Sequence, residues 1–427
     1  MTDPAKSRRL LLVSYWYPPA VGAAAERMHS FAKYLPALGW DVRVLTARHG
    51  EGPHADPGVI AVVDPWRMRS AAIADYDPFA KLSFSSRLRV FLRDCIFPDR
   101  FVRWQRAAFD AVQSLISQWP PDVILASFPP ASAVELALRI QSATGAPLVL
   151  DYRDKWIGPG GYEPKRAAMR RRHEELERQA LAASSAVTAV SEALLNDAVK
   201  THPRSNDRTA VIYNGFEPIE ELEECRPRQI HQSNTAIQIA HVGTVIPRNR
   251  PELFFSSLSQ LVTHQTDAIH GVHFRFVGNL SAGFAANKTL SPWLTSTGLV
   301  SRDIARAEMF NTDALLLLTG DYVGKWGYSV KLFEYLQTGR PILCLEESPG
   351  SNDARLLREL APDRAFIGRL GDPGSLSEQL ARLRTYLSTE SAKPAGVRAP
   401  SPGLARFSRA NQAARLDAFL RELRIPD

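Results

Sequence analysis

Short apolar runs that alternate with amphipathic helical segments constrain the fold of this chain most. The first run, residues 10–15, leads through a loop to a helix expected from about Ala24 to Leu38, and the next run covers residues 41–46. A strand, loop, helix and strand in this order form the repeating unit of a parallel sheet. Near-continuous apolar strands are buried on both faces by helices. We therefore expect an α/β protein built on parallel sheets.

The strand pattern occurs in two series along the chain. The first series continues with expected strands at residues 122–126, 147–150, 184–191 and 210–215. The second series has expected strands at residues 237–243, 273–278, 314–318 and 341–345. A charged stretch from Glu217 to Ser233 separates the two series and is typical of an interdomain linker.

Two domains fit the chain length of 427 residues. We expect an N-terminal Rossmann-like domain in residues 1–220 and a second one in residues 221–403. A segment rich in Pro, Ala and Ser, residues 389–403, is typical of a connector. It leads to an amphipathic helix, within residues 404–427, that we expect to pack back on the N-terminal domain.

Composition narrows the class of protein. Hydrophobic residues make up 45% and charged residues 23%, as in soluble folded proteins. The net charge of +7 fits phosphate-bearing ligands, anionic membranes and nucleic acid equally well. Cys95, Cys225 and Cys344 are too few and too widely spaced for a disulfide framework or a zinc site, which indicates a reducing, cytoplasmic setting. Neither a signal peptide nor a membrane-spanning run of about 20 apolar residues is expected.

Glu334 is the single acidic residue on an otherwise apolar helical segment that ends at Gly339, just before the strand at 341–345. A carboxylate near the ligand crevice of a Rossmann-like unit can hold a polar ligand. The alternative is that Glu334 only solvates one face of the helix.

Several motifs in order along the chain carry a family resemblance. They are Tyr15 with Pro18, Pro19 and Gly22, then residues 151–156, Val190-Ser191, residues 213–216, residues 241–244 and residues 331–341. Together they resemble the retaining glycosyltransferases of the two-domain GT-B fold, in the family four (group 1) type, over almost the whole chain. The resemblance implies two Rossmann-like parallel-sheet domains that face a central cleft.

The resemblance implies a nucleoside-diphosphate-sugar donor, with UDP as the first choice of nucleotide and GDP as the second. The C-terminal domain would bind this donor and the N-terminal domain a hydroxyl acceptor. Glu334 matches the second glutamate of the family's Glu-x7-Glu motif and would accept hydrogen bonds from ribose hydroxyls. Arg248 or Arg250, following Gly243 and Thr244, would contact the diphosphate, and Lys331 would add a point charge there.

The first glutamate of that motif is absent, because Trp326 stands eight residues before Glu334. The sequence therefore does not indicate which sugar is transferred. We expect residues 324–329 to form a loop whose amides and hydroxyls, including those of Tyr328 and Ser329, hold diphosphate or sugar oxygens. Gly22 would let the N-terminal loop approach the donor closely.

Asp151, Arg153 and Asp154 follow the expected strand at residues 147–150, at the edge where parallel sheets bind ligands. Asp151 or Asp154 would serve as base or orienter for the acceptor hydroxyl. The alternative is that both carboxylates cap the next helix and pair with Arg153. A metal site is not expected, because the adjacent arginine competes as a cation and GT-B enzymes generally need no metal.

The resemblance implies a metal-independent hexosyltransferase without a cofactor, in glycan, glycolipid or secondary-metabolite biosynthesis. Its acceptor would be a glycan, a lipid-linked molecule or a small molecule. A basic, apolar segment in residues 86–106 fits peripheral contact with the inner face of a membrane, or a helix with its arginines in water. A nucleotide-sugar epimerase and a catalytically silent partner subunit are the alternatives. No nucleic-acid partner is expected, since no recognition motif accompanies the charge.

Overall fold

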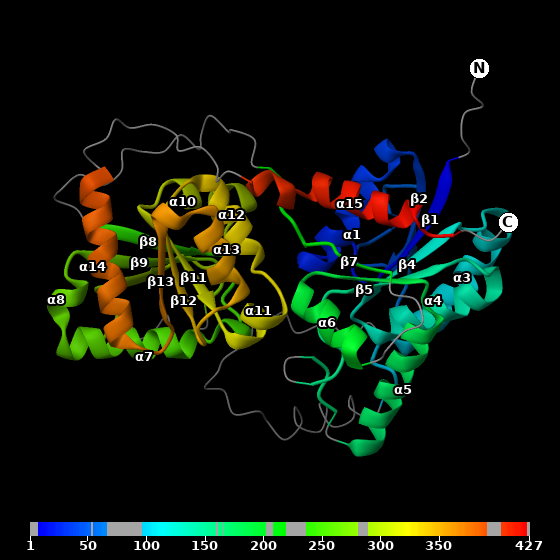
Figure 1. The fold of residues 1–427 in the computed structure, drawn as a ribbon, viewed down its shortest axis with the longest axis horizontal. Helices are drawn as coiled ribbons and strands as arrows, with labels where there is room; N and C mark the ends of the chain where they lie inside the picture. The colour runs from blue at the N-terminus through cyan, green and yellow to red at the C-terminus, as the bar shows by residue number, and fades with distance from the viewer. Residues whose placement is uncertain are drawn as a thin grey trace. The chain divides into compact units, whose positions relative to one another are not determined.

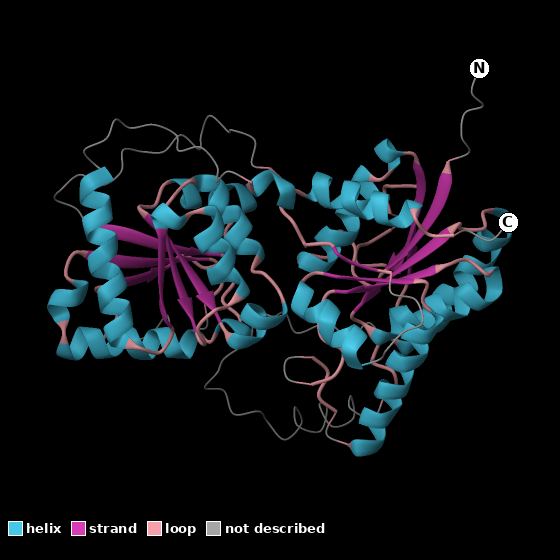
Figure 2. Cartoon of the chain, viewed as in Figure 1, coloured by secondary structure: helices cyan, strands magenta, loops and turns pink. Residues whose placement is uncertain are grey.

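The computed structural model describes residues 7–52, 54–65, 96–158, 161–164, 166–201, 208–218, 236–280, 289–390 and 403–424. These residues divide into two compact units, each with its own parallel sheet (Figure 1). The first unit ends at Gly215 and resumes at Phe407, and the second runs from Phe216 to Arg406. In each unit helices cover the sheet (Figure 2).

The first unit has a seven-stranded parallel sheet in the order β3-β2-β1-β4-β5-β6-β7. The strands are β1 (Arg8–Val13), β2 (Trp40–Ala47), β3 (Val59–Val62), β4 (Val123–Phe128), β5 (Leu148–Tyr152), β6 (Ala186–Ala189) and β7 (Thr209–Val211). The direction of winding reverses between β1 and β4. In open α/β sheets, ligands bind beyond the carboxyl ends of the strands at such a switch point.

The C-terminal helix belongs to the first unit. The helices of this unit are α1 (Ala23–Tyr34), η1 (Pro36–Leu38), α3 (Val102–Gln118), α4 (Ala131–Thr144), α5 (Ala167–Ala183), α6 (Glu192–Thr201) and α15 (Arg409–Arg421). The apolar residues Leu416 and Leu420 of α15 join a buried cluster with Met28 and Phe31 of α1. Figure 1 shows the two helices side by side, and this burial of apolar surface holds the chain's end in place.

The second unit has a six-stranded parallel sheet in the order β10-β9-β8-β11-β12-β13. The strands are β8 (Ile237–Val242), β9 (Val272–Val277), β10 (Leu294–Ser296), β11 (Ala314–Thr319), β12 (Ile342–Glu346) and β13 (Ala365–Arg369). The helices are η4 (Pro247–Asn249), α7 (Pro251–His264), α8 (Thr266–Ile269), α10 (Arg302–Phe310), α11 (Asp321–Trp326), α12 (Val330–Thr338), α13 (Asn352–Leu360), η5 (Pro362–Arg364) and α14 (Pro373–Glu390), with η6 (Leu404–Phe407) next along the chain. The switch point lies between β8 and β11. The prediction of two α/β units with parallel sheets is confirmed.

Two local expectations are wrong. Residues 324–326 are not part of a loop, because α11 continues to Trp326 and only residues 327–329 separate it from α12. Asp151 lies inside β5 instead of after it. Residues 86–95 of the basic segment are outside the described residues. None of the helices within the described ranges is long and apolar enough to cross a bilayer.

Candidate functional site

Two glycines allow the segments after β8 and β9 to approach closely, next to the switch point between β8 and β11. A Cβ atom on Gly278 would lie only 2.7 Å from the carbonyl carbon of Gly243, so a side chain would separate the two loops. Gly243 also has a φ of 113°, which residues with side chains rarely adopt. The backbone at Gly243 therefore forms a bare corner beyond the carboxyl end of β8, the position where ligands bind in this class of sheet.

The side chain of Lys331 lies against this corner. A Cβ atom on Gly243 would lie 2.6 Å from Cε of Lys331. The ammonium donates to the carbonyl oxygen of Thr244 at 3.0 Å and contacts Nε2 of His241 at 3.1 Å. Burial lowers the pKa of Lys331 to about 8, although the nearby Glu334 carboxylate acts in the opposite direction. The ammonium is thus a cation held at the end of β8, as the sequence predicts for a diphosphate contact.

Helix α12 is fastened to the end of β8 by two residues one turn apart. Besides Lys331, Tyr335 accepts a hydrogen bond from the backbone N–H of Val242 at 2.9 Å. Residues four apart share one face of a helix. Glu334 lies between them in sequence and is half-buried. Its place three residues after Lys331 puts a carboxylate beside the ammonium, while its contact with a ribose stays a prediction.

The two arginines that follow β8 have different surroundings. The guanidinium of Arg250 lies between two carboxylates, with Nη1 2.6 Å from Glu347 and Nε 2.5 Å from Glu252. Arg248 is exposed, and its guanidinium lies 4.3 Å above the ring of Tyr322. Arg250 therefore has a structural task in the loop, whereas the contact of Arg248 with a diphosphate stays a prediction.

A buried carboxylate organises the start of α12. The backbone N–H of Ser329, the residue before α12, donates to Oδ1 of Asp353 at 2.9 Å, and the hydroxyl of Thr319 donates to Oδ2 at 3.0 Å. Burial raises the pKa of Asp353 to about 6, against the effect of these two hydrogen bonds. The ring of Tyr328 lies 6.1 Å from that of Phe333. Sequence reasoning missed Asp353, which lies in the first turn of α13, where acidic residues are common.

In the first unit, Gly22 immediately precedes α1 and is exposed. Its φ of 135° favours glycine, and no heavy atom lies within 4 Å of the position that a Cβ would take. Helix α1 thus begins next to an exposed glycine in the segment that follows β1. This arrangement is compatible with the close approach that the sequence predicts, and that approach remains a prediction.

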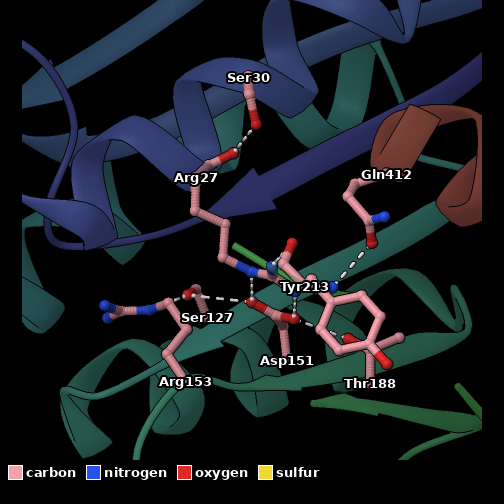
Figure 3. A network of polar contacts seen from close by, with 8 residues as sticks. All are labelled: Arg27, Ser30, Ser127, Asp151, Arg153, Thr188, Tyr213 and Gln412. Atoms are coloured by element: carbon pink, nitrogen blue, oxygen red, sulfur yellow. Dashed lines mark hydrogen bonds and ion pairs between the residues drawn. The ribbon is translucent and has the colours of Figure 1, made fainter. Parts of the chain in front are cut away.

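Asp151 is completely buried and pairs with Arg27, not with Arg153 (Figure 3). Nη2 and Nε of Arg27 donate to its two oxygens at 2.7 and 2.9 Å, and Thr188 donates to Oδ1 at 2.7 Å. For Asp151, the alternative of a pair with Arg153 is therefore replaced by a pair with Arg27. A carboxylate with these partners and no exposed surface is badly placed to take a proton from an acceptor hydroxyl.

Arg153 turns away from Asp151 in Figure 3. Its Nε donates to the hydroxyl of Ser127 at 2.7 Å, and its Nη2 donates to the carbonyl oxygen of Pro129. Burial lowers the pKa of this guanidinium. Asp154 is half-buried. Of the three residues predicted at this edge, Asp151 and Arg153 make hydrogen bonds within the first unit, and the charge of Asp154 acts on the Arg153 guanidinium.

Most of the first unit matches a known family of protein domains. The glycosyl transferase 4-like domain model matches residues 22–215, which lie within the first unit. Residues 22–215 belong to the glycosyl transferase 4-like family. This match, together with the solved structures described next, supports the resemblance of the chain to family four glycosyltransferases of the GT-B fold. No curated protein sequence matches the chain.

Solved structures of this glycosyltransferase fold cover nearly the whole chain. Sucrose-phosphate synthase from Thermosynechococcus elongatus has a TM-score of 0.63 at 11% identity, over 97% of this chain and 98% of its own. HepE from Anabaena, in complex with UDP-glucose, has a TM-score of 0.60 at 14% identity, over 97% and 100%. WaaG, a glycosyltransferase involved in lipopolysaccharide biosynthesis, has a TM-score of 0.57 at 14% identity, over 95% and 99%. These similarities concern the fold.

No metal site is evident in the part of the chain that the structure describes, since no group of three or more His, Cys, Asp or Glu side chains gathers there. Lys331 places a cation at the end of β8, and a diphosphate contact of Lys331 or Arg248 stays a prediction.

Proposed function

We propose that the chain is a retaining hexosyltransferase that takes its sugar from a UDP-sugar, or from a GDP-sugar as the second choice. The observation that carries the proposal is the ammonium of Lys331 beside the bare backbone corner at Gly243. A cation next to uncovered backbone at the end of a parallel strand suits a diphosphate. HepE, which shares the fold, has been solved with UDP and with UDP-glucose, and this supports the choice of nucleotide.

In the proposed reaction, the bond between sugar C1 and the diphosphate oxygen breaks, and a bond from C1 to the acceptor oxygen forms on the same face. Negative charge grows on the departing phosphate oxygen, and Lys331 and Arg248 would stabilise it. The acceptor proton passes to that phosphate oxygen. No strong protein base is then required, which agrees with the burial of Asp151. Glu334 would bind the ribose, and Tyr328 and Ser329 the sugar or diphosphate oxygens.

We propose a hydroxyl acceptor on a glycan, a lipid-linked molecule or a small molecule, bound by the first unit in the cytoplasm without a metal or cofactor. Burial and the charge of Asp99 raise the pKa of the Glu135 carboxyl, and the nearby Arg139, Arg106 and Arg172, from α4, α3 and α5, act in the opposite direction. Three exposed arginines from three helices form a basic surface. Such a surface suits contact with an anionic membrane face.

Thermal unfolding with UDP, GDP, ADP and their sugar conjugates tests donor binding. We expect UDP or GDP to raise the melting temperature, because a ligand that binds only the folded state stabilises it. Incubation of the donor alone then separates a transferase from an epimerase, which would release an altered sugar without an acceptor. Proton NMR of the glycoside product gives the anomeric configuration. An inverted product would overturn the retaining mechanism, and absence of binding to every nucleotide would favour a catalytically silent subunit.

A further inference from the structure

His241 is a polar residue within the apolar strand β8. Only 1% of its surface is exposed, and its neighbours Ala240 and Val242 are buried as well. Burying an imidazole is costly unless its nitrogens are hydrogen-bonded. Both nitrogens have partners: Nδ1 lies 3.0 Å from the carbonyl oxygen of Leu316, and Nε2 lies 3.1 Å from Nζ of Lys331.

These two partners fix the protonation of His241. A carbonyl oxygen only accepts a hydrogen bond, so Nδ1 must carry the proton and donate it to Leu316. An ammonium only donates, so Nε2 must be the unprotonated acceptor. Burial and the charge of Lys331 lower the pKa of His241 well below its usual range, in agreement with this neutral tautomer. The imidazole therefore acts as a neutral acceptor for the ammonium.

The contacts of Lys331 set the direction of its remaining hydrogen. An ammonium has three hydrogens, and His241 and the carbonyl of Thr244 account for two of them. The side chain is confined along Gly243, where a Cβ would meet Cε. We propose that His241 is a positioning residue that, through Lys331, presents one ammonium hydrogen to the diphosphate of the nucleotide-sugar donor. This inference rests on the proposed function. It assigns to His241, a residue of strand β8, the orientation of the Lys331 ammonium.

The alternative is that His241 only fills space in the core. Measurement of UDP affinity at pH 7 in the full chain distinguishes this space-filling role from the positioning role. In His241→Phe the ring volume stays but the acceptor is lost, and we expect UDP to bind roughly 10-fold more weakly. In a Lys331→Met background the same substitution should have no further effect. Equal weakening in both backgrounds, or no weakening in either, would overturn the proposal.

Two amide variants keep the test decisive if the phenylalanine variant does not fold. The amide of Gln reaches the position of Nε2 and can accept from the ammonium, whereas that of Asn reaches only the position of Nδ1. We expect His241→Gln to keep UDP affinity within about threefold of the wild type and His241→Asn to lose roughly 10-fold. Equal UDP affinity in these two variants would contradict the positioning role.

The pH profile of UDP binding gives a second readout. The charged group that shares α12 with Lys331 is Glu334, while Leu316 of β11 and the ring of Phe276 of β9, 5.5 Å away, contribute no charge. The alkaline limb should move to lower pH in His241→Phe, because the ammonium loses an acceptor and gives up its proton more readily, and it should stay near the wild-type position in His241→Gln. The same limb in His241→Phe as in the wild type would count against the proposal. If the wild-type chain binds neither UDP nor GDP, the proposed function fails instead.

Discussion

Arg27 on α1 and Asp151 on β5 form a two-pronged ion pair, at 2.7 and 2.9 Å, that has almost no exposed surface. Nη1 of Arg27 also donates to the carbonyl oxygen of Tyr213, at 2.9 Å. The backbone N–H of Tyr213 in turn donates to the side chain of Gln412 on α15, at 2.8 Å (Figure 3). The pair thereby joins α1, β5, the segment after β7 and the C-terminal helix.

Loss of one partner leaves an uncompensated buried charge. We therefore expect Arg27→Met to lower the free energy of unfolding of the first unit by about 3–5 kcal/mol. Urea denaturation followed by tryptophan fluorescence measures this change. The matched control is Arg178→Met, which removes the exposed pair with Glu175 and should leave stability unchanged. Similar urea midpoints for the two variants would contradict the structural role of Asp151.

The sequence predicted both sheets because strands such as β4 and β11 are largely apolar and buried at every residue. It missed β3, β10 and β13, which have four, three and five residues and lie at the sheet edges. Short edge strands carry little periodicity. Ion pairs between distant residues could not be predicted for a different reason: Arg27 and Asp151 are 124 positions apart in the sequence. No local pattern connects them.

The residues of the candidate site could be predicted from the sequence, but the contacts that each of them makes could not. Gly243 and Lys331 were both expected, yet their contact depends on where α12 lies against β8. Arg248 and Arg250 look equivalent in the sequence, and only the position of Glu252 and Glu347 separates them. His241 stood in a motif, but its role depends on Leu316 in the neighbouring strand β11.

Asp353 should make the stability of the second unit depend on pH. Burial raises its folded pKa from 3.8 to about 6, so the folded state favours the protonated acid. The unfolded acid loses its proton first as the pH rises, and stability contributed by this group is therefore lost between about pH 4 and 6. In Asp353→Asn this loss should be absent, which melting temperatures from pH 4 to 7 would reveal. Parallel pH curves for the two proteins would refute the assignment.

Gly243→Ala should disturb the ammonium at the bare corner. The new Cβ would lie 2.6 Å from Cε of Lys331, and the side chain would have to move. We expect UDP affinity to fall roughly 10-fold through the lost charge-assisted contact. Gly271→Ala is the control, because Gly271 also has a positive φ, of 68°, but nothing lies within 4 Å of its Cβ position. Calorimetric titration with UDP should show a loss in the first variant alone.

Glu334→Ala tests the ribose contact. A carboxylate that accepts hydrogen bonds from two ribose hydroxyls is worth about 10-fold or more in affinity, so UDP should stabilise this variant less. Glu378→Ala removes an exposed carboxylate on α14 of the same unit and should leave UDP stabilisation unchanged. Thermal shifts over a UDP concentration series measure both. Undiminished stabilisation of Glu334→Ala would remove Glu334 from the donor site.

The pKa of Lys331 sets the alkaline limit of donor binding. With a pKa of about 8 in the free protein, the amine loses its charge as the pH rises above that value. Because a bound diphosphate favours the ammonium, UDP affinity should fall by up to about tenfold per pH unit above about 8, until the higher pKa of the complex is reached. UDP is already fully ionised there, since its second phosphate pKa is about 6. Titrations between about pH 7 and 9.5 should show this decline in the wild type and a flat profile in Lys331→Met. A decline of the same size in both proteins would mean that another group governs the pH dependence.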